Sequence, residues 1–103
     1  MRYSAKTDDN HMDVVKRFRE YGCSVLDASR MGKGFPDIIV GYRHVNYLIE
    51  IKDGKKPQSK QKLTPDQVVF FDTWKGQVQV INSLEAVDKF MVRVRHETNR
   101  ETL

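Results

Sequence analysis

The chain has 103 residues, of which 39% are hydrophobic and 31% are charged. This length suffices for one domain around one core, so residues 1–103 are expected to form a single domain. No apolar run approaches the roughly 18 residues of a membrane span, and the first residues lack the apolar stretch of a signal peptide. The single Cys23 excludes an internal disulfide and fits a reducing compartment, so we expect a cytoplasmic protein with no membrane partner. The net charge of +4 is compatible with a polyanionic partner.

The first third of the chain predicts a helix followed by a strand. The helix is expected from about Asp9 to Tyr21, with Asp8 or Asp9 as its cap and Gly22 at its end. A strand over about Ser24–Ala28 follows. The apolar stripe of the helix is predicted to consist of Met12, Val14, Val15, Phe18 and Tyr21.

The next two segments are apolar runs interrupted by charges. The run Gly34–Gly41 contains Asp37, and the run Tyr47–Lys52 contains Glu50 and ends in a lysine. Charged residues rarely lie inside such runs unless they are paired or bind a metal. The two segments are therefore the first candidates for a functional site.

A hairpin would bring these charges together. If the two runs pair through a turn centred between Arg43 and His44, Asp37 lies opposite Glu50, at a Cβ–Cβ distance of about 4.5–5.5 Å. Because side chains alternate along a strand, Lys52 shares that face with both acids. Two carboxylates at this distance repel each other unless a cation lies between them. Hard oxygen ligands favour Mg²⁺ or Mn²⁺ for that cation.

The second half of the chain predicts a loop, a helix, a strand and a last helix. The polar loop Asp53–Leu63 contains four lysines. Thr64-Pro65-Asp66-Gln67 is a capping box that begins a helix expected to end at Gly76, with the rings of Phe70, Phe71 and Trp74 in the core. Gln77–Ile81 alternates like a strand, and a helix is expected from Ser83 to about Val92. The two ends of the chain, residues 1–7 and the segment from about His96, are predicted to be loose.

The motif resembles that of the PD-(D/E)XK nuclease superfamily. Pro36-Asp37 is separated by twelve residues from Glu50-Ile51-Lys52, and the predicted element order matches the αβββαβ core of that superfamily. The glycine-rich lead-in to Pro36 and the start of the helix at Leu63–Gln67 are similar to the VRR-NUC branch. Small stand-alone members of that branch occur in phages and are similar to Holliday-junction resolvases. The resemblance implies an α/β fold, a mixed sheet flanked by helices, with an additional C-terminal helix.

The same resemblance implies a metal-dependent DNA endonuclease that acts on branched or Holliday-junction DNA. Asp37, Glu50 and the backbone carbonyl of Ile51 would hold Mg²⁺ or Mn²⁺, and Lys52 would act on the attacking water. The alternative for these residues is a structural ion pair on a sheet face. The alternatives for the function are a non-catalytic DNA-binding or assembly protein on the same fold and a monomeric nickase or flap nuclease.

Further residues are candidates for supporting roles. His11, or Asp13 in its place, could face the metal from the first helix, although a buried core histidine is the commoner arrangement. Gln67 could touch the site or only cap its helix. Basic residues near the motif could contact phosphates or be solvated: Arg30, Lys33, Lys55, Lys56, Lys60 and Lys62.

A homodimer is expected, because junction resolution needs two symmetric sites. The last helix would supply the interface, since its apolar residues exceed what one face needs: Leu84, Val87, Phe90, Met91 and Val94. The alternative is that this helix completes the core of a monomer.

Overall fold

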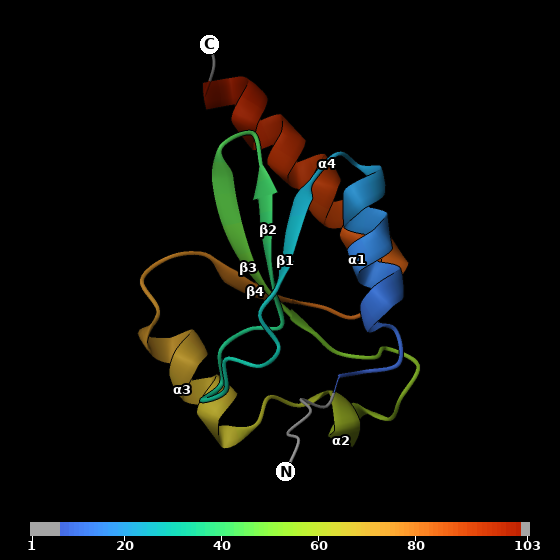
Figure 1. The fold of residues 1–103 in the computed structure, drawn as a ribbon, viewed down its shortest axis with the longest axis vertical. Helices are drawn as coiled ribbons and strands as arrows, with labels where there is room; N and C mark the ends of the chain where they lie inside the picture. The colour runs from blue at the N-terminus through green and yellow to red at the C-terminus, as the bar shows by residue number, and fades with distance from the viewer. Residues whose placement is uncertain (1–6, 102–103) are drawn as a thin grey trace.

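The computed structural model describes residues 7–101, with side chains through residue 97. The described residues form four helices and four strands: three strands follow the first helix, two helices come next, and the last strand precedes the last helix (Figure 1). Their bounds are α1 His11–Glu20, β1 Ser24–Asp27, β2 Ile38–Tyr42, β3 Val45–Ile51, α2 Gln58–Gln61, α3 Pro65–Thr73, β4 Val78–Ile81 and α4 Leu84–Glu101. Among the described residues, no helix has both the length and the apolar character that crossing a bilayer requires.

The strands form one mixed sheet in the order β1-β2-β3-β4. The first three are antiparallel neighbours, whereas β4 runs parallel to β3 after the crossover through α2 and α3. The predicted α/β class, the mixed sheet and the C-terminal helix are thus confirmed. The largest differences from the predicted elements are that α2 lies within the predicted polar loop, that α3 ends at Thr73 rather than Gly76, and that α4 continues to Glu101, through the segment from His96 that was predicted to be loose.

The central hairpin has the predicted register. Ile38 pairs with Ile49 and Tyr42 pairs with Val45, so a two-residue turn joins β2 to β3. Arg43 and His44 form that turn with positive φ angles of 50° and 67°. This left-handed conformation matches the twist of the flanking strands and gives a tight hairpin.

One face of the sheet carries the core. Side chains of β2, β3 and β4 on this face pack against α1 and α4, which lie side by side in Figure 1. The fully buried residues of this core include Val14, Phe18, Ile38, Val40, Ile49, Val87 and Met91. On α4, four of the five apolar residues expected to form a dimer interface are instead buried in this core, namely Val87, Phe90, Met91 and Val94. They complete the core of a single chain, which was the alternative for this helix.

The opposite face of the sheet is more open. Its apolar residues include Leu26, 63% exposed, and Val80, 39% exposed. Helix α3 lies away from α1 and α4 (Figure 1) and has no buried residue. The expectation that its aromatic residues are core is wrong: Trp74 is 44% exposed and stacks on Phe70, with ring centroids 5.0 Å apart.

The start of α1 also differs from the prediction. Its N-cap is Asn10, which makes no side-chain cap hydrogen bond, and Asp8 instead lies 3.7 Å from Lys56. Met12 is 63% exposed rather than part of the buried stripe. Gly22 ends the helix with a φ of 88°, as its position predicted. The predicted basic arm falls mostly on residues 1–6, outside the described residues.

Candidate active site

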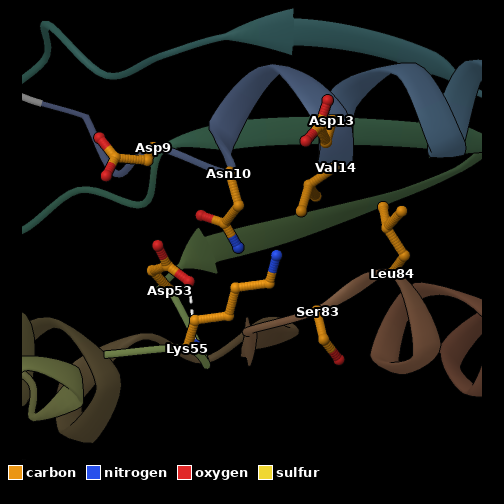
Figure 2. A pocket seen from close by; sticks show the side chains of 8 residues that line it. All are labelled: Asp9, Asn10, Asp13, Val14, Asp53, Lys55, Ser83 and Leu84. Carbon is orange, nitrogen blue, oxygen red and sulfur yellow. Dashed lines mark hydrogen bonds between the residues drawn. The ribbon is translucent and has the colours of Figure 1, made fainter. Parts of the chain in front are cut away.

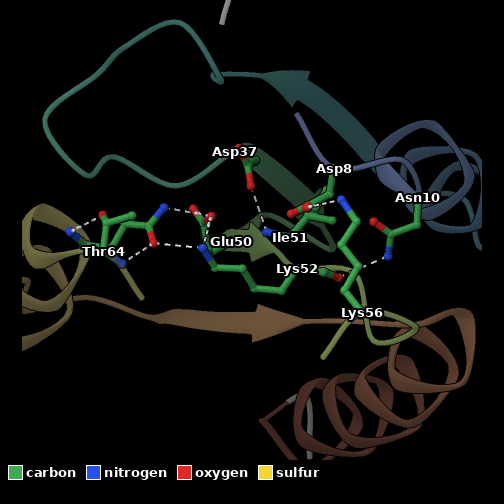
Figure 3. Close-up of polar contacts among 9 residues, drawn as sticks. Asp8, Asn10, Asp37, Glu50, Ile51, Lys52, Lys56 and Thr64 are labelled. Carbon is green, nitrogen blue, oxygen red and sulfur yellow. Dashed lines mark hydrogen bonds and ion pairs between the residues drawn. The ribbon is translucent and has the colours of Figure 1, made fainter. Parts of the chain in front are cut away.

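The three charged motif residues converge on the open face of the sheet (Figure 3). Ile38, Ile49 and Ile51 point into the core, so by alternation Asp37, Glu50 and Lys52 point to the other side. Asp37 immediately precedes β2 and is held at both its backbone and its side chain. Its carbonyl accepts from the Ala28 N–H at 2.8 Å, and its Oδ2 accepts from the Ile51 N–H at 2.8 Å.

Glu50 is the most deeply buried acid of this group, with 3% of its surface exposed. Its Oε2 accepts a hydrogen bond from Gln67 Nε2 at 2.9 Å and lies 3.6 Å from Lys52 Nζ. Its Oε1 is buried and has no hydrogen-bond partner among the described residues. A buried carboxylate oxygen without a donor is costly, so this carboxyl needs either a proton or a cation.

The electrostatics lead to the same conclusion. Burial, the negative charge of Asp37 and the hydrogen bond that a protonated Glu50 shares with Asp37 raise the pKa of Glu50 to about 8. The ammonium of Lys52 opposes this rise without cancelling it. In the absence of another cation, the pair therefore retains a proton near neutral pH.

Gln67 connects helix α3 to the charged group. Its side-chain oxygen accepts from Lys52 Nζ and from the Thr64 N–H, each at 2.9 Å, while its amide nitrogen donates to Glu50. Thr64 Oγ1 accepts from the Gln67 N–H in return, which completes the predicted capping box. The two roles considered for Gln67 are thus combined in one side chain.

The loop between β1 and β2 holds α3 in place. Gly34 has a φ of 79°, and a Cβ there would overlap the backbone carbonyl of Asp66 and lie 2.8 Å from Gln67 N. Phe35, the next residue, packs edge-on against Phe70 with ring centroids 5.3 Å apart. Only glycine permits this close approach, and the approach fixes the first turn of α3 over the charged group.

The predicted phosphate-binding residues have different surroundings. Lys60 on α2 and Lys62 after it are exposed, as are Arg30 and Lys33 in the loop before β2. Lys56 is engaged by an acid, because its Nζ lies 3.7 Å from Asp8 Oδ1. Arg30, Lys33, Lys60 and Lys62 are therefore better candidates than Lys56 for contact with a polyanion.

Lys55 and Asp13 lie at a separate pocket of about 460 Å³ (Figure 2). The pocket lies between the N-terminal ends of α1 and α4 and the segment after β3, and it also contains the acids Asp9 and Asp53. Three carboxylates around one ammonium repel phosphate, so Lys55 is a poorer candidate for DNA contact than Lys60.

His11 lies on the core side of the sheet. It is 4% exposed, and its Nε2 is 3.6 Å from Asp27 Oδ2. Asp27 pairs with the core residue Ile38, and its pKa is lowered by hydrogen bonds from Ser29 and, more weakly, by His11. Neither His11 nor Asp13 belongs to the hydrogen-bond network around Glu50.

Asn10 makes a contact that its position in the sequence did not predict. Its Nδ2 donates to the Lys52 carbonyl at 3.0 Å and so joins the start of α1 to the end of β3 (Figure 3). An asparagine at a helix start ordinarily indicates a cap, so the sequence held no signal for this role.

The described residues contain no group of three or more His, Cys, Asp or Glu side chains that could hold a metal ion. The candidate donor set is therefore the pair Asp37 and Glu50. Comparisons of this chain with protein-family models, curated proteins and solved structures find no match. Any functional assignment consequently depends on the geometry of the site itself.

Proposed function

We propose that this chain is a metal-dependent phosphodiesterase that cuts DNA, in the manner of the PD-(D/E)XK nucleases that its motif resembles. The observation that most directly supports this proposal is the arrangement around Glu50. This carboxylate is 3% exposed and lies beside Asp37, and one of its oxygens has no hydrogen-bond donor among the described residues. A purely structural ion pair would satisfy that oxygen. Two neighbouring carboxylates whose negative charge is only partly balanced by Lys52 are instead suited to binding a divalent cation.

The donor chemistry fits Mg²⁺ or Mn²⁺. Asp37, Glu50 and the carbonyl of Ile51 would hold the ion through oxygen atoms, which both ions prefer. A divalent cation bound there lowers the pKa of a coordinated water and offsets charge on a phosphate.

The other residues of the site would position the reaction. Lys52 is 7% exposed and its Nζ is oriented by Gln67 at 2.9 Å. An ammonium has three donors, so Lys52 can also orient an attacking water or donate to a phosphate oxygen. Lys60, Lys62, Arg30 and Lys33 would hold the DNA backbone.

A direct test combines metal binding with cleavage. Isothermal titration with Mn²⁺ should show binding to the wild-type chain and none to Asp37→Asn, while Asp13→Asn, which alters an acid at the separate pocket, should bind normally. Supercoiled plasmid and a four-way junction should be cut with Mg²⁺ and left intact with chelator. Robust cleavage in excess chelator would refute the metal dependence. DNA binding without cleavage under any divalent ion would favour a binding protein.

A structure-selective substrate, and junction resolution in particular, is the narrower form of this proposal. It requires a homodimer, since two symmetric cuts need two sites. The interface would have to use a surface other than the buried face of α4, such as the exposed Val69, Trp74 and Val80. Light scattering across a concentration series measures this, and a mass of about 12 kDa throughout would leave a nickase or flap nuclease as the form of the activity.

A further inference from the structure

The loop between β1 and β2, which leads into Asp37, presents an exposed methionine. Met31 is 66% exposed at the tip of this loop, with Arg30 before it and Lys33 two residues after it, both exposed. A single exposed apolar residue is ordinary on a protein surface. Met31 differs from such residues because hydrogen bonds hold the loop that carries it and because basic residues flank it.

The loop is braced on both sides of its tip. On the β1 side, the N–H and hydroxyl of Ser29 donate to Asp27 at 2.8 and 2.6 Å, and the Met31 N–H donates to the Ala28 carbonyl at 3.0 Å. On the β2 side, the Phe35 N–H donates to the Gly32 carbonyl at 3.1 Å. The tip is therefore held outward by its own backbone.

The bracing also fixes the tip relative to the acids. Ala28, which accepts from the Met31 N–H, donates its own N–H to the carbonyl of Asp37 at 2.8 Å. Gly34 presses on the first turn of α3, and that turn carries the Gln67 side chain bound to Glu50. The loop that carries Met31 is thus attached to Asp37 at one end and to the first turn of α3 at the other.

We propose that Met31 acts as a wedge that enters an opened base step of the DNA, while Arg30 and Lys33 hold the phosphates on either side. This inference rests on the proposed function and names its substrate class: DNA with an unstacked step, such as a nick, gap or branch point. Apolar wedges, methionine among them, unstack base steps in proteins that bend DNA. Insertion is easiest where stacking is already weakened, so the wedge selects such steps over intact duplex.

The test uses DNA with 2-aminopurine beside a one-nucleotide gap, with Ca²⁺ replacing Mg²⁺ to keep the DNA uncut. Binding of the wild-type chain should raise the fluorescence of the probe, because the base leaves its stack. Met31→Ala should lose this rise and about tenfold of the preference for gapped over intact duplex. Met31→Leu, which keeps an apolar side chain, should retain most of both.

Met12→Ala is the matched control, since Met12 is equally exposed, at 63%, on the outer side of α1. It should change neither fluorescence nor preference. Met31→Ala that keeps both properties would overturn the wedge, as would a wild-type chain that binds and cuts gapped DNA with no change in fluorescence. A wild-type chain that binds none of these DNAs would overturn the proposed function together with the wedge.

Discussion

The buried acid pair predicts an unusual stability effect. Replacing Glu50 by Gln should stabilise the metal-free protein at alkaline pH, although the substitution removes a residue of the candidate active site. The glutamine oxygen can still accept from Gln67 Nε2, which donates to Glu50 at 2.9 Å. Its amide can donate toward Asp37, as a protonated Glu50 would. The substitution thus mimics the protonated acid and removes the charge that burial penalises.

The magnitude follows from the pKa of Glu50, which rises from an ordinary 4.5 to about 8 in the folded chain. A raised pKa in the folded state means that folding binds a proton. The contribution of Glu50 to the free energy of unfolding is therefore greatest below pH 4.5. It decreases as the pH rises toward 8 and is constant above pH 8. At about 1.4 kcal/mol for each tenfold change in proton affinity, the whole loss is about 5 kcal/mol. The advantage of Glu50→Gln should be near zero at pH 4.5 and approach this value at pH 9.

Urea unfolding of both proteins in chelator, from pH 4.5 to pH 9, measures the effect. The difference between the two curves isolates Glu50 together with its interactions with Asp37 and Lys52, because every other titrating group is common to both proteins. Glu85→Gln is the control: Glu85 is exposed on α4, 3.1 Å from Lys89, and should show no such growth with pH. Saturating Mg²⁺ should reduce the difference in the free energy of unfolding between the two proteins, because it should stabilise only the wild-type chain. A wild-type curve parallel to that of Glu50→Gln at all pH values would refute the reasoning.

Further substitutions test the candidate site, the loop that holds α3 and the nearby lysines. Lys52→Ala should lower single-turnover cleavage by about 10²–10³-fold while leaving metal affinity by calorimetry nearly unchanged, because the role proposed for Lys52 is in the transition state. A normal rate at saturating metal would contradict this. Gly34→Ala should displace the first turn of α3 and so lower both the free energy of unfolding and the cleavage rate. Gly32→Ala is the control, since Gly32 has a φ of 74° and no atom near the position of an added Cβ. It should lower the free energy of unfolding by about 1–3 kcal/mol and leave the cleavage rate unchanged. Lys60→Gln with Lys62→Gln should reduce the slope of log affinity against log salt by about 0.9 for each phosphate that the variant no longer neutralises, and an unchanged slope would make both lysines solvated surface.

The sequence was sufficient for the hairpin because strict alternation leaves few options. Every apolar residue of β2 and β3 that faces α1 fixes the direction of its neighbours, and a slip of one residue would bury Asp37 and expose Ile38. The turn at Arg43 and His44 follows from that register rather than from residue type, since neither is glycine. The convergence of Glu50 and Lys52 could therefore be derived without coordinates.

The position of α3 could not be derived in that way. Val68, Val69, Phe70 and Phe71 are consecutive apolar residues, and such a run has no periodicity that favours one face of a helix. The sequence therefore suggested a core helix, whereas the structure holds it by its first turn, through Gly34 and the side chain of Gln67. The exposure of Trp74 follows from this tethering at one end. Interactions of this kind join residues far apart in the chain and leave no local pattern.

The two faces of the sheet carry different features, the core on one and the candidate site on the other. Helices α1 and α4 complete the core on one face, which frees the other from the need to bury apolar surface. A buried carboxyl such as Glu50, whose Oε1 has no hydrogen-bond partner among the described residues, can be tolerated only where the rest of the fold supplies the stability that its burial removes. The extension of α4 beyond its predicted end at Val92 agrees with this division, because the longer helix adds Val94 to the core. A divalent cation bound as proposed would offset the negative charge of this acid pair, so the stability experiment and the metal titration probe the same two carboxyl groups.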